Sequence, residues 1–131
     1  MLGNRALALV AFCLLGTGTA LAASDWVGYT PAAFSAVQES GKTILVDVTA
    51  DWCPTCKAQK PILDELRAEE RLGEVVFIRL DFDVHKDFLQ AHNVPRQSTI
   101  LVFVGGAEVG RSIAETDRER LRNFVFESVA P

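Results

Sequence analysis

Apolar runs alternate with amphipathic segments over most of the chain. The run Thr43–Thr49 is hydrophobic at almost every position, which is typical of a central strand buried on both faces. A second strand is predicted at Val75–Phe82. Two further runs, Thr99–Val104 and Ala107–Ile113, flank a Gly-Gly turn and predict a β-hairpin.

Four helices are predicted from capping residues and from hydrophobic residues at helical spacing. We expect Asp83 to cap the third helix, and Thr116 with Glu119 to form a capping box at the fourth. The expected ranges are Ala32–Ser40, Pro54 to about Leu72, Val84–His92 and residues 117–129. The order α-β-α-β-α-β-β-α predicts an α/β protein with a central mixed sheet and helices on both faces.

The first 22 residues have the pattern of a secretory signal peptide. A short start with one basic residue, Arg5, precedes the apolar run Ala6–Leu15, and an Ala-x-Ala site ends at Ala22. We therefore expect cleavage after Ala22 and one domain over residues 23–131, with an exported, periplasmic location. The alternative is an uncleaved membrane anchor, but ten apolar residues are too few to span a bilayer.

The net charge and the number of cysteines exclude some functions and favour others. The chain has 13 basic and 17 acidic residues, and removal of residues 1–22 takes away Arg5 alone, so the net charge changes from −4 to −5. Without a basic patch, nucleic acid is not an expected partner. Cys13 would leave with the leader, so Cys53 and Cys56 remain. Because the loop they close is very short, they are better suited to redox chemistry than to stabilisation.

The Cys-x-x-Cys pair follows a buried strand and opens a helix. A thiolate at a helix N-terminus faces unpaired backbone N–H groups and the positive end of the helix dipole. This environment lowers the pKa of the thiol, and the thiolate is the nucleophile. The sequence therefore predicts a reactive thiol at Cys53, with Cys56 one turn further on.

Several motifs resemble the thioredoxin superfamily over most of the expected domain. The matching residues are Val46-Asp47, Ala50-Asp51-Trp52-Cys53, Cys56-Lys57, Pro61-Ile62-Leu63-Asp64-Glu65-Leu66, Asp83, Thr99 to Phe103 and Gly106. The block around the cysteines is also similar to the C-terminal periplasmic domain of the transmembrane disulfide-interchange reductases. The Cys-Pro-Thr-Cys tetrapeptide is similar to that of the cytochrome c maturation thioredoxins.

The resemblance implies a role for each of four residues. Cys53 would be the attacking and more exposed thiol, and Cys56 would resolve the mixed disulfide. Asp47 would be a buried acid that moves a proton to or from Cys56; a desolvated carboxyl also has a raised pKa that suits this task. The alternative is an Asp47 that is only capped or ion-paired, with Arg79 or Lys57 as its partner. Trp52 would shield the site and dock substrates, or else pack in the core.

The chain departs from the family at the proline that packs against the disulfide. In the ungapped register that position is Ser98, while Pro95 lies three residues earlier. The alternative is a shifted loop that brings Pro95 to the site. Gln97, Ser98 and Thr99 are the expected docking segment for substrates. Because a cis bond before a non-proline residue costs about 2.5–4 kcal/mol, we predict a trans Gln97–Ser98 peptide with the Ser98 hydroxyl facing Cys53.

These features predict an exported, monomeric thiol–disulfide oxidoreductase that reduces disulfides of client proteins and receives electrons from a membrane donor. The Pro-Thr pair between the cysteines holds no cation to stabilise the thiolate, which favours a moderately low redox potential. We expect no cofactor, and no metal at His85, His92 and the cysteines, since their spacing does not bring four ligands together. The alternative function is a non-catalytic binding module with a structural or metal-linked cysteine pair.

Overall fold

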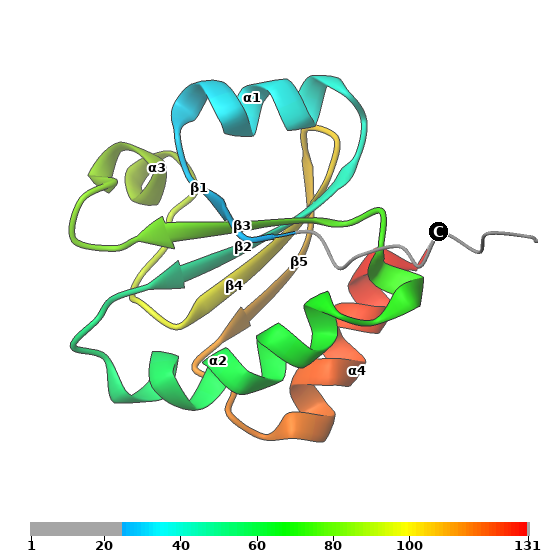
Figure 1. Ribbon diagram of the computed structural model, residues 1–131. Helices are drawn as coiled ribbons and strands as arrows, with labels where there is room; N and C mark the ends of the chain where they lie inside the picture. Colours follow the sequence, from blue (N-terminus) through cyan, green and yellow to red (C-terminus); the bar gives the residue numbers. More distant parts are fainter. Residues whose placement is uncertain (1–24, 131) are drawn as a thin grey trace, which may run out of the picture.

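A mixed five-stranded sheet forms the centre of the molecule (Figure 1). The computed structural model describes residues 25–130, so the expected leader at residues 1–22 lies outside the described residues. The strand order is β1-β3-β2-β4-β5; β3 pairs in parallel with β1 and β2, while β4 pairs antiparallel with β2 and β5. The strands are β1 Val27–Gly28, β2 Thr43–Thr49, β3 Val76–Asp81, β4 Thr99–Val104 and β5 Ala107–Ile113.

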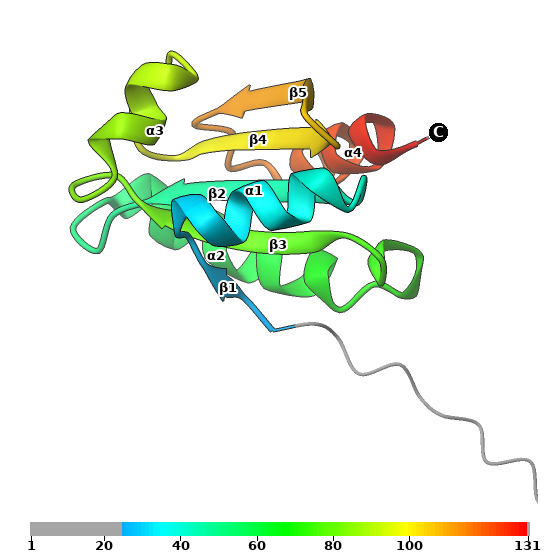
Figure 2. The ribbon, with the colours of Figure 1, turned by 90° about the horizontal axis from the view of Figure 1, so that it is seen from above.

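Helices cover both faces of this sheet, which confirms the predicted architecture. Helices α1 and α3 lie on one face, and α2 and α4 lie on the other (Figures 1 and 2). Each face has its own hydrophobic core. The helices are α1 Pro31–Glu39, α2 Pro54–Arg67, α3 Lys86–Ala91 and α4 Arg118–Val129, with a short 3-10 turn η1 at Glu70–Leu72.

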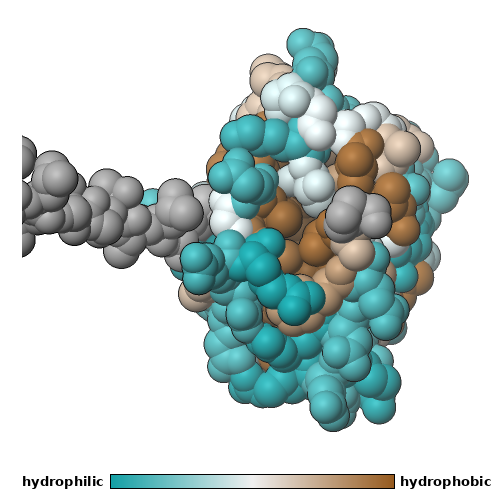
Figure 3. All heavy atoms as spheres, turned by 90° about the vertical axis from the view of Figure 1, so that its right-hand side faces the viewer, coloured by the Kyte–Doolittle hydropathy of each residue, from teal (hydrophilic) through white to brown (hydrophobic). Residues whose placement is uncertain are grey.

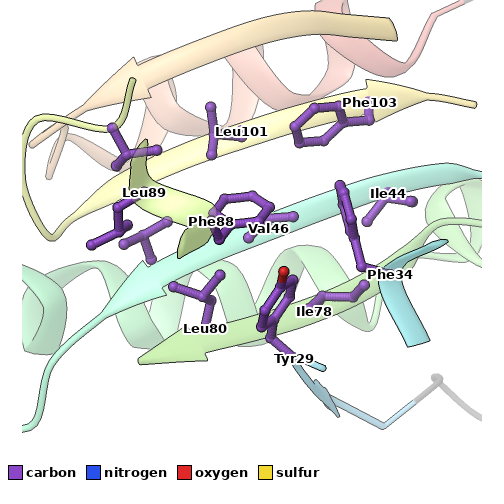
Figure 4. Packing of buried hydrophobic residues seen from close by; sticks show 12 residues of the cluster. Tyr29, Phe34, Ile44, Val46, Ile78, Leu80, Phe88, Leu89, Leu101 and Phe103 are labelled. Atoms are coloured by element: carbon purple, nitrogen blue, oxygen red, sulfur yellow. The ribbon is translucent and has the colours of Figure 1, made fainter. Parts of the chain in front are cut away.

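The core under α1 and α3 is built around aromatic rings. Phe34 of α1, Phe88 of α3 and Phe103 of β4 meet edge to face, with ring centroids 5.3 Å apart for Phe34–Phe88 and for Phe34–Phe103 (Figure 4). Tyr29 extends this cluster and contacts Phe88. Edge-to-face packing suits the charge distribution of aromatic rings and adds to the burial of their apolar surface.

The central strand β2 contributes to both cores because its side chains alternate between the two faces. Ile44, Val46 and Val48 lie in the aromatic core, whereas Leu45 lies in the core beneath α2 and α4. By the same alternation Asp47 is on the face covered by α2. The strand therefore places one carboxyl group beneath the helix that carries the cysteines.

One strand and the end of helix α2 differ from the prediction. Strand β1, Val27–Gly28, was not predicted, since two residues are too few to show a periodic pattern. Helix α2 ends at Arg67 rather than near Leu72. The N–H groups of Ala68 and Glu69 bond to carbonyls three residues earlier, which tightens and ends the helix, and the separate 3-10 turn then buries Leu72.

The predicted caps of the last two helices are wrong. Helix α3 begins after His85, and the Asp83 carboxylate bonds instead to the Trp52 indole. Helix α4 begins after Asp117, whose side chain accepts a hydrogen bond from Arg120 N at 2.9 Å. The Glu115 carboxylate accepts the Asp117 N–H at 2.8 Å, and this turn moves the cap one residue beyond Thr116.

The cysteines follow the C-terminal end of β2 and open α2. In Figure 1 this end of the sheet is on the left. The opposite end of the molecule faces the viewer in Figure 3, where apolar and polar residues are mixed around the end of α4. Within residues 25–130, both cysteines therefore lie at one end of the sheet.

Candidate active site

A tight turn connects β2 to α2 and places Cys53 at the helix start. Cys53 N donates to Ala50 O at 3.1 Å, which closes the turn. Cys53 is the N-cap of α2, followed by Pro54 at the first helical position, where a proline is well tolerated. Its sulfur accepts a hydrogen bond from Cys56 N at 3.1 Å. The predicted contact between a thiol group and the helix N-terminus is therefore present.

Cys53 and Cys56 form a disulfide, with their Cα atoms 5.3 Å apart. The prediction that Cys53 is the more exposed of the two is wrong in this oxidised form. Cys53 is 1% exposed and Cys56 is 5% exposed. The residues pack with Ala50 and Phe82, and Ser98 covers the pair from the other side. A position at the start of a helix does not by itself expose a side chain when other segments pack over it.

Ser98 lies directly against the disulfide. No cis peptide is present in residues 25–130, and the Ser98 hydroxyl is 3.1 Å from Cys53 Sγ and 3.2 Å from Cys56 Sγ. Both parts of the prediction, the trans peptide and the hydroxyl facing Cys53, are confirmed. Since a disulfide sulfur carries no hydrogen, the hydroxyl is the donor in this state.

The loop that carries Ser98 is held by the backbone in an unusual conformation. Ser98 has a φ of 64°, a left-handed value that is uncommon for residues other than glycine. Ser98 N donates to Val48 O at 2.8 Å, and Ser98 O accepts from Ala114 N at 2.9 Å. Pro95 is exposed, so the alternative of a shifted loop that brings this proline to the disulfide is wrong.

The other residues of the expected docking segment differ in exposure. Gln97 is half-buried, whereas Thr99 is fully buried, and Thr99 Oγ1 donates to Arg96 O at 2.7 Å. Trp52 is 57% exposed, and its indole N–H donates to Asp83 Oδ2 at 2.7 Å. The alternative of Trp52 as a core residue is therefore wrong. Docking by these residues stays a prediction.

Asp47 is buried and also forms an ion pair. It is 3% exposed, and Arg79 Nε lies 3.2 Å from its Oδ2 atom. Burial raises the pKa of Asp47, while the charge of Arg79 acts in the opposite direction. The Arg79 guanidinium stacks on the Trp26 ring at 3.8 Å, and Trp26 Nε1 in turn donates to Asp64 Oδ1. The predicted buried acid and its alternative, the ion pair, are thus both present.

Asp47 and Cys56 line the same cavity, which has a volume of about 250 Å³. This arrangement lets the carboxyl group serve the second thiol, directly or through water. His85 and His92 lie instead against Tyr29 and Phe88, in the aromatic core. Within residues 25–130, no group of three or more histidine, cysteine or acidic side chains is placed to hold a metal ion.

Sequence reasoning missed Gln59, which fixes the Ser98 loop. This side chain of α2 is fully buried, and its amide donates to Ser98 O at 3.2 Å and to Glu115 O at 2.9 Å. Its Oε1 atom has no hydrogen-bond partner. The sequence contained a signal for this residue. Gln59 lies at helical spacing from Ile62, Leu63 and Leu66, so it is a polar residue within the apolar stripe of the helix.

A Cys-x-x-Cys disulfide at a helix N-terminus, after the central strand of a mixed sheet, is the arrangement of a thiol–disulfide oxidoreductase. The thioredoxin family model matches residues 27–127. The chain belongs to the thioredoxin family, and it is a thiol–disulfide oxidoreductase.

Individual relatives agree with this assignment. The chain is 30% identical over 93 residues to thioredoxin C-2 of Corynebacterium nephridii, covering 71% of this chain and 85% of that protein. It is 33% identical over 88 residues to the bifunctional thioredoxin reductase/thioredoxin of Mycobacterium leprae, covering 67% of this chain but 19% of that much longer protein.

Solved structures show the same fold. The structure of Trxlp from Edwardsiella tarda has a TM-score of 0.72 and 42% identity, covering 75% of this chain and 96% of that one. Thioredoxin from Malassezia sympodialis has a TM-score of 0.71 at 20% identity, covering 82% and 96%, and supports the fold alone. No helix in residues 25–130 is long and apolar enough to cross a bilayer.

Proposed function

We propose that this chain is an exported protein-disulfide reductase that acts through the Cys53/Cys56 dithiol. The observation that carries the proposal is the environment of Cys53 Sγ. The Cys56 N–H lies at 3.1 Å, the Ser98 hydroxyl also lies at 3.1 Å, and the α2 N-terminus adds its dipole. Each of these donors favours the thiolate over the thiol and prepares Cys53 to attack.

In the reduced protein, the Cys53 thiolate attacks one sulfur of a client disulfide. A Cys53–client disulfide forms, and the second client sulfur leaves as a thiolate. Cys56 then loses its proton to Asp47 and attacks Cys53 Sγ. This step forms the intramolecular disulfide and releases the client in its reduced form. The residues proposed to contact the client are Trp52, which is exposed, and the segment Gln97–Thr99, in which Ser98 contacts the disulfide.

Reduction rather than oxidation is proposed because Pro54 and Thr55, between the cysteines, bear no cation. A less stabilised thiolate makes the dithiol a better reductant. Equilibration with glutathione buffers of known ratio measures the potential. A potential as high as that of strongly oxidising thiol oxidases would contradict the proposed direction.

Insulin reduction in the presence of dithiothreitol tests the activity. Wild-type protein should accelerate precipitation of the insulin B chain, whereas Cys53→Ser should be inactive. Cys56→Ser should accumulate mixed disulfides with clients through Cys53. A wild-type protein that leaves the insulin rate unchanged would instead support a non-catalytic binding module.

The relative reactivity of the two thiols is a separate test. Alkylation of the reduced protein at mildly acidic pH should label Cys53 before Cys56, because Cys53 Sγ accepts the hydrogen bond of the Cys56 N–H at the start of α2. Peptide mass spectrometry identifies the labelled residue. Preferential labelling of Cys56 would contradict the assignment of Cys53 as the nucleophile.

Export, a membrane electron donor and a monomeric state complete the proposal. They rest on the leader pattern of residues 1–22 and on the resemblance to the periplasmic domain of disulfide-interchange reductases. Expression of the full chain, followed by fractionation and determination of the N-terminus, tests export. A new N-terminus at Ala23 in the periplasmic fraction is the expected result, and an intact Met1 in the cytoplasm would contradict it.

A further inference from the structure

The Ser98 hydroxyl is shared between the two sulfurs of the disulfide. Its oxygen lies 3.1 Å from Cys53 Sγ and 3.2 Å from Cys56 Sγ. Cys53 Sγ has a second donor, the Cys56 N–H at 3.1 Å. Cys56 Sγ has no other hydrogen-bond partner within residues 25–130. In this part of the chain, the hydroxyl is therefore the one donor that contacts the sulfur of the resolving thiol.

The loop holds Ser98 in a backbone conformation that favours glycine. The φ of 64° is a left-handed value, in which the Cβ atom of other residues crowds the following carbonyl oxygen. The Ser98 N–H donates to Val48 O, and Ser98 O accepts from Ala114 N. The Gln59 amide donates to the same oxygen. Glycine would fit this loop with less strain but would supply no donor, so the hydroxyl is the feature that a serine adds here.

The oxidised form is the product of the resolving step, in which Cys56 attacks Cys53 and releases the client. During thiol–disulfide exchange the negative charge spreads from the attacking sulfur over the central sulfur to the leaving sulfur. The Ser98 hydroxyl contacts the attacking and the central sulfur of this step. A donor that is already in place where charge develops stabilises the transition state without reorganisation.

The single hydrogen of the hydroxyl can serve the two sulfurs in turn, because it rotates about the C–O bond to suit its acceptor. In the dithiol the anion is the Cys53 thiolate. In the mixed disulfide Cys53 carries the client sulfur and no charge, and Cys56 becomes the anion when its proton leaves. The hydrogen bond can therefore pass from one sulfur to the other while the Ser98 backbone stays in place.

We propose that Ser98 is a catalytic residue of both exchange steps, and that its hydroxyl donates first to the Cys53 thiolate and then to the Cys56 thiolate. The inference rests on the proposed function, and it adds the resolving step to the contact with Cys53 described above. A donor to Cys56 Sγ offsets the burial that disfavours ionisation of this thiol, which is 5% exposed in the oxidised form.

The hydroxyl keeps its own proton through the resolving step. The Cys56 proton passes to Asp47, and the Cys56 thiolate forms a bond to Cys53 Sγ. The bond between Cys53 and the client sulfur breaks, and its electron pair leaves with the client as a thiolate. The dithiol is oxidised to a disulfide, and the client disulfide is reduced.

A small chromogenic disulfide, dithiobis(nitrobenzoate), separates the two steps. Attack by Cys53 of the reduced protein releases one coloured thiolate, at a rate proportional to the reagent concentration. Attack by Cys56 on the mixed disulfide then releases the second, at a rate that does not depend on this concentration. Stopped-flow absorbance over a range of pH gives an acid dissociation constant for each thiol.

Two variants remove the hydroxyl in different ways. Ser98→Gly suits the φ of 64°, whereas Ser98→Ala retains the Cβ atom. Each variant should lower the acid dissociation constants of both phases by about fivefold, the worth of an ordinary hydrogen bond. Ser112→Ala is the matched control, because it removes from β5 a half-buried hydroxyl that bonds to neither sulfur.

Three results of this comparison would overturn the proposal. The first is a change in the Cys53 phase alone or in neither phase. The second is a change in only one of the two Ser98 variants, which would assign the effect to the backbone. The third is a change of the same size in Ser112→Ala.

The variant Cys53→Ala isolates the contact with Cys56. Ultraviolet absorbance of the thiolate measures the pKa of Cys56 in this variant and in the double variant Cys53→Ala/Ser98→Gly. The pKa should be higher in the double variant, again by about fivefold in the acid dissociation constant. Equal pKa values would refute the contact with the Cys56 thiolate.

The proposed function can fail independently of this inference. If the wild-type protein does not accelerate insulin reduction, the proposed function fails. If it does, but Ser98→Gly leaves the second phase unchanged, only the role of Ser98 in the resolving step fails.

Discussion

The two faces of the sheet bury different kinds of side chain. The face under α1 and α3 holds an aromatic cluster in which Tyr29, Phe34, Phe88 and Phe103 contact one another. The face under α2 contains the buried polar groups of the site, including Asp47, Gln59 and Ser98. Burial of apolar rings stabilises the fold, whereas burial of a carboxyl or an unpaired amide oxygen costs stability.

This difference shows how a small domain can remain folded although the buried polar groups of its site lower its stability. Strand β2 alternates between the two faces, so the same seven residues anchor the aromatic core and place Asp47 at the cavity that Cys56 also lines. Proteins of this size have total stabilities of only about 5–15 kcal/mol. The apolar face must therefore offset the polar one, and the substitutions below test this division.

The largest expected effect is on the apolar face. Phe88→Ala should lower the free energy of unfolding by about 3–5 kcal/mol, because a large ring is lost from a packed core. Urea denaturation measures this change. Val84→Ala, at an exposed neighbouring position, is the control and should change stability by less than about 0.5 kcal/mol. If Phe88→Ala costs no more than this control, the aromatic core is not the main source of stability.

Asp47→Asn should raise the free energy of unfolding, whereas Phe88→Ala lowers it. Because burial raises the pKa of Asp47, its ionised form destabilises the folded state, and the variant should be more stable by roughly 1–3 kcal/mol at neutral pH. Both folded and unfolded states are protonated below the ordinary pKa of about 3.9, so the gain should be absent there and should appear as the pH rises.

The same variant should slow disulfide exchange, by up to about 100-fold if Asp47 accepts the Cys56 proton. Stopped-flow reduction of a client disulfide over a range of pH measures this effect. Retention of the wild-type rate and pH profile would remove Asp47 from the proton transfer. A loss of stability at neutral pH would show that the pairing with Arg79 outweighs desolvation.

Ser98→Ala tests the contact between the loop and the nucleophile. Loss of the hydroxyl should raise the pKa of the Cys53 thiol and lower its reactivity at pH values below that pKa by about fivefold, the worth of an ordinary hydrogen bond. Iodoacetamide kinetics of the reduced protein measure the change. An unaltered pH profile would mean that the hydroxyl does not stabilise the thiolate. Ser98→Pro should lower stability, because proline cannot adopt the φ of 64° found at Ser98 and removes the N–H that bonds to Val48 O.

The smallest expected change in stability belongs to Gln59→Leu. One hydrogen bond to Ser98 O and one to Glu115 O are lost, but a buried oxygen without a partner is also removed, so stability should change by less than about 1 kcal/mol. Cys53 reactivity should nevertheless fall in the same direction as in Ser98→Ala. Gln90→Leu, an exposed position on α3, is the control. If Cys53 in Gln59→Leu is as reactive as in the control, Gln59 contributes to packing and does not position the Ser98 hydroxyl.

Most of the architecture could be predicted from local patterns. The strand Thr43–Thr49, the hairpin 99–113 and the helix that begins at Pro54 each carry a strong periodic or turn signal, and the structure contains all of them. The caps at Asp83 and Thr116 were predicted wrongly because several adjacent residues can cap a helix. The choice among them depends on competing contacts, such as the Trp52–Asp83 hydrogen bond.

The sequence by itself determined the chemistry of this protein: two thiols at a strand–helix junction and a carboxyl in the strand beneath them. Spacing along the chain is enough for this, because the first turn of a helix and the alternation of a strand are local geometry. Only the tertiary structure decided that the Ser98 hydroxyl contacts both sulfurs and that Gln59 holds the Ser98 carbonyl. These contacts join segments about 40 residues apart, and their geometry depends on how the loop packs on the sheet, which no local pattern encodes.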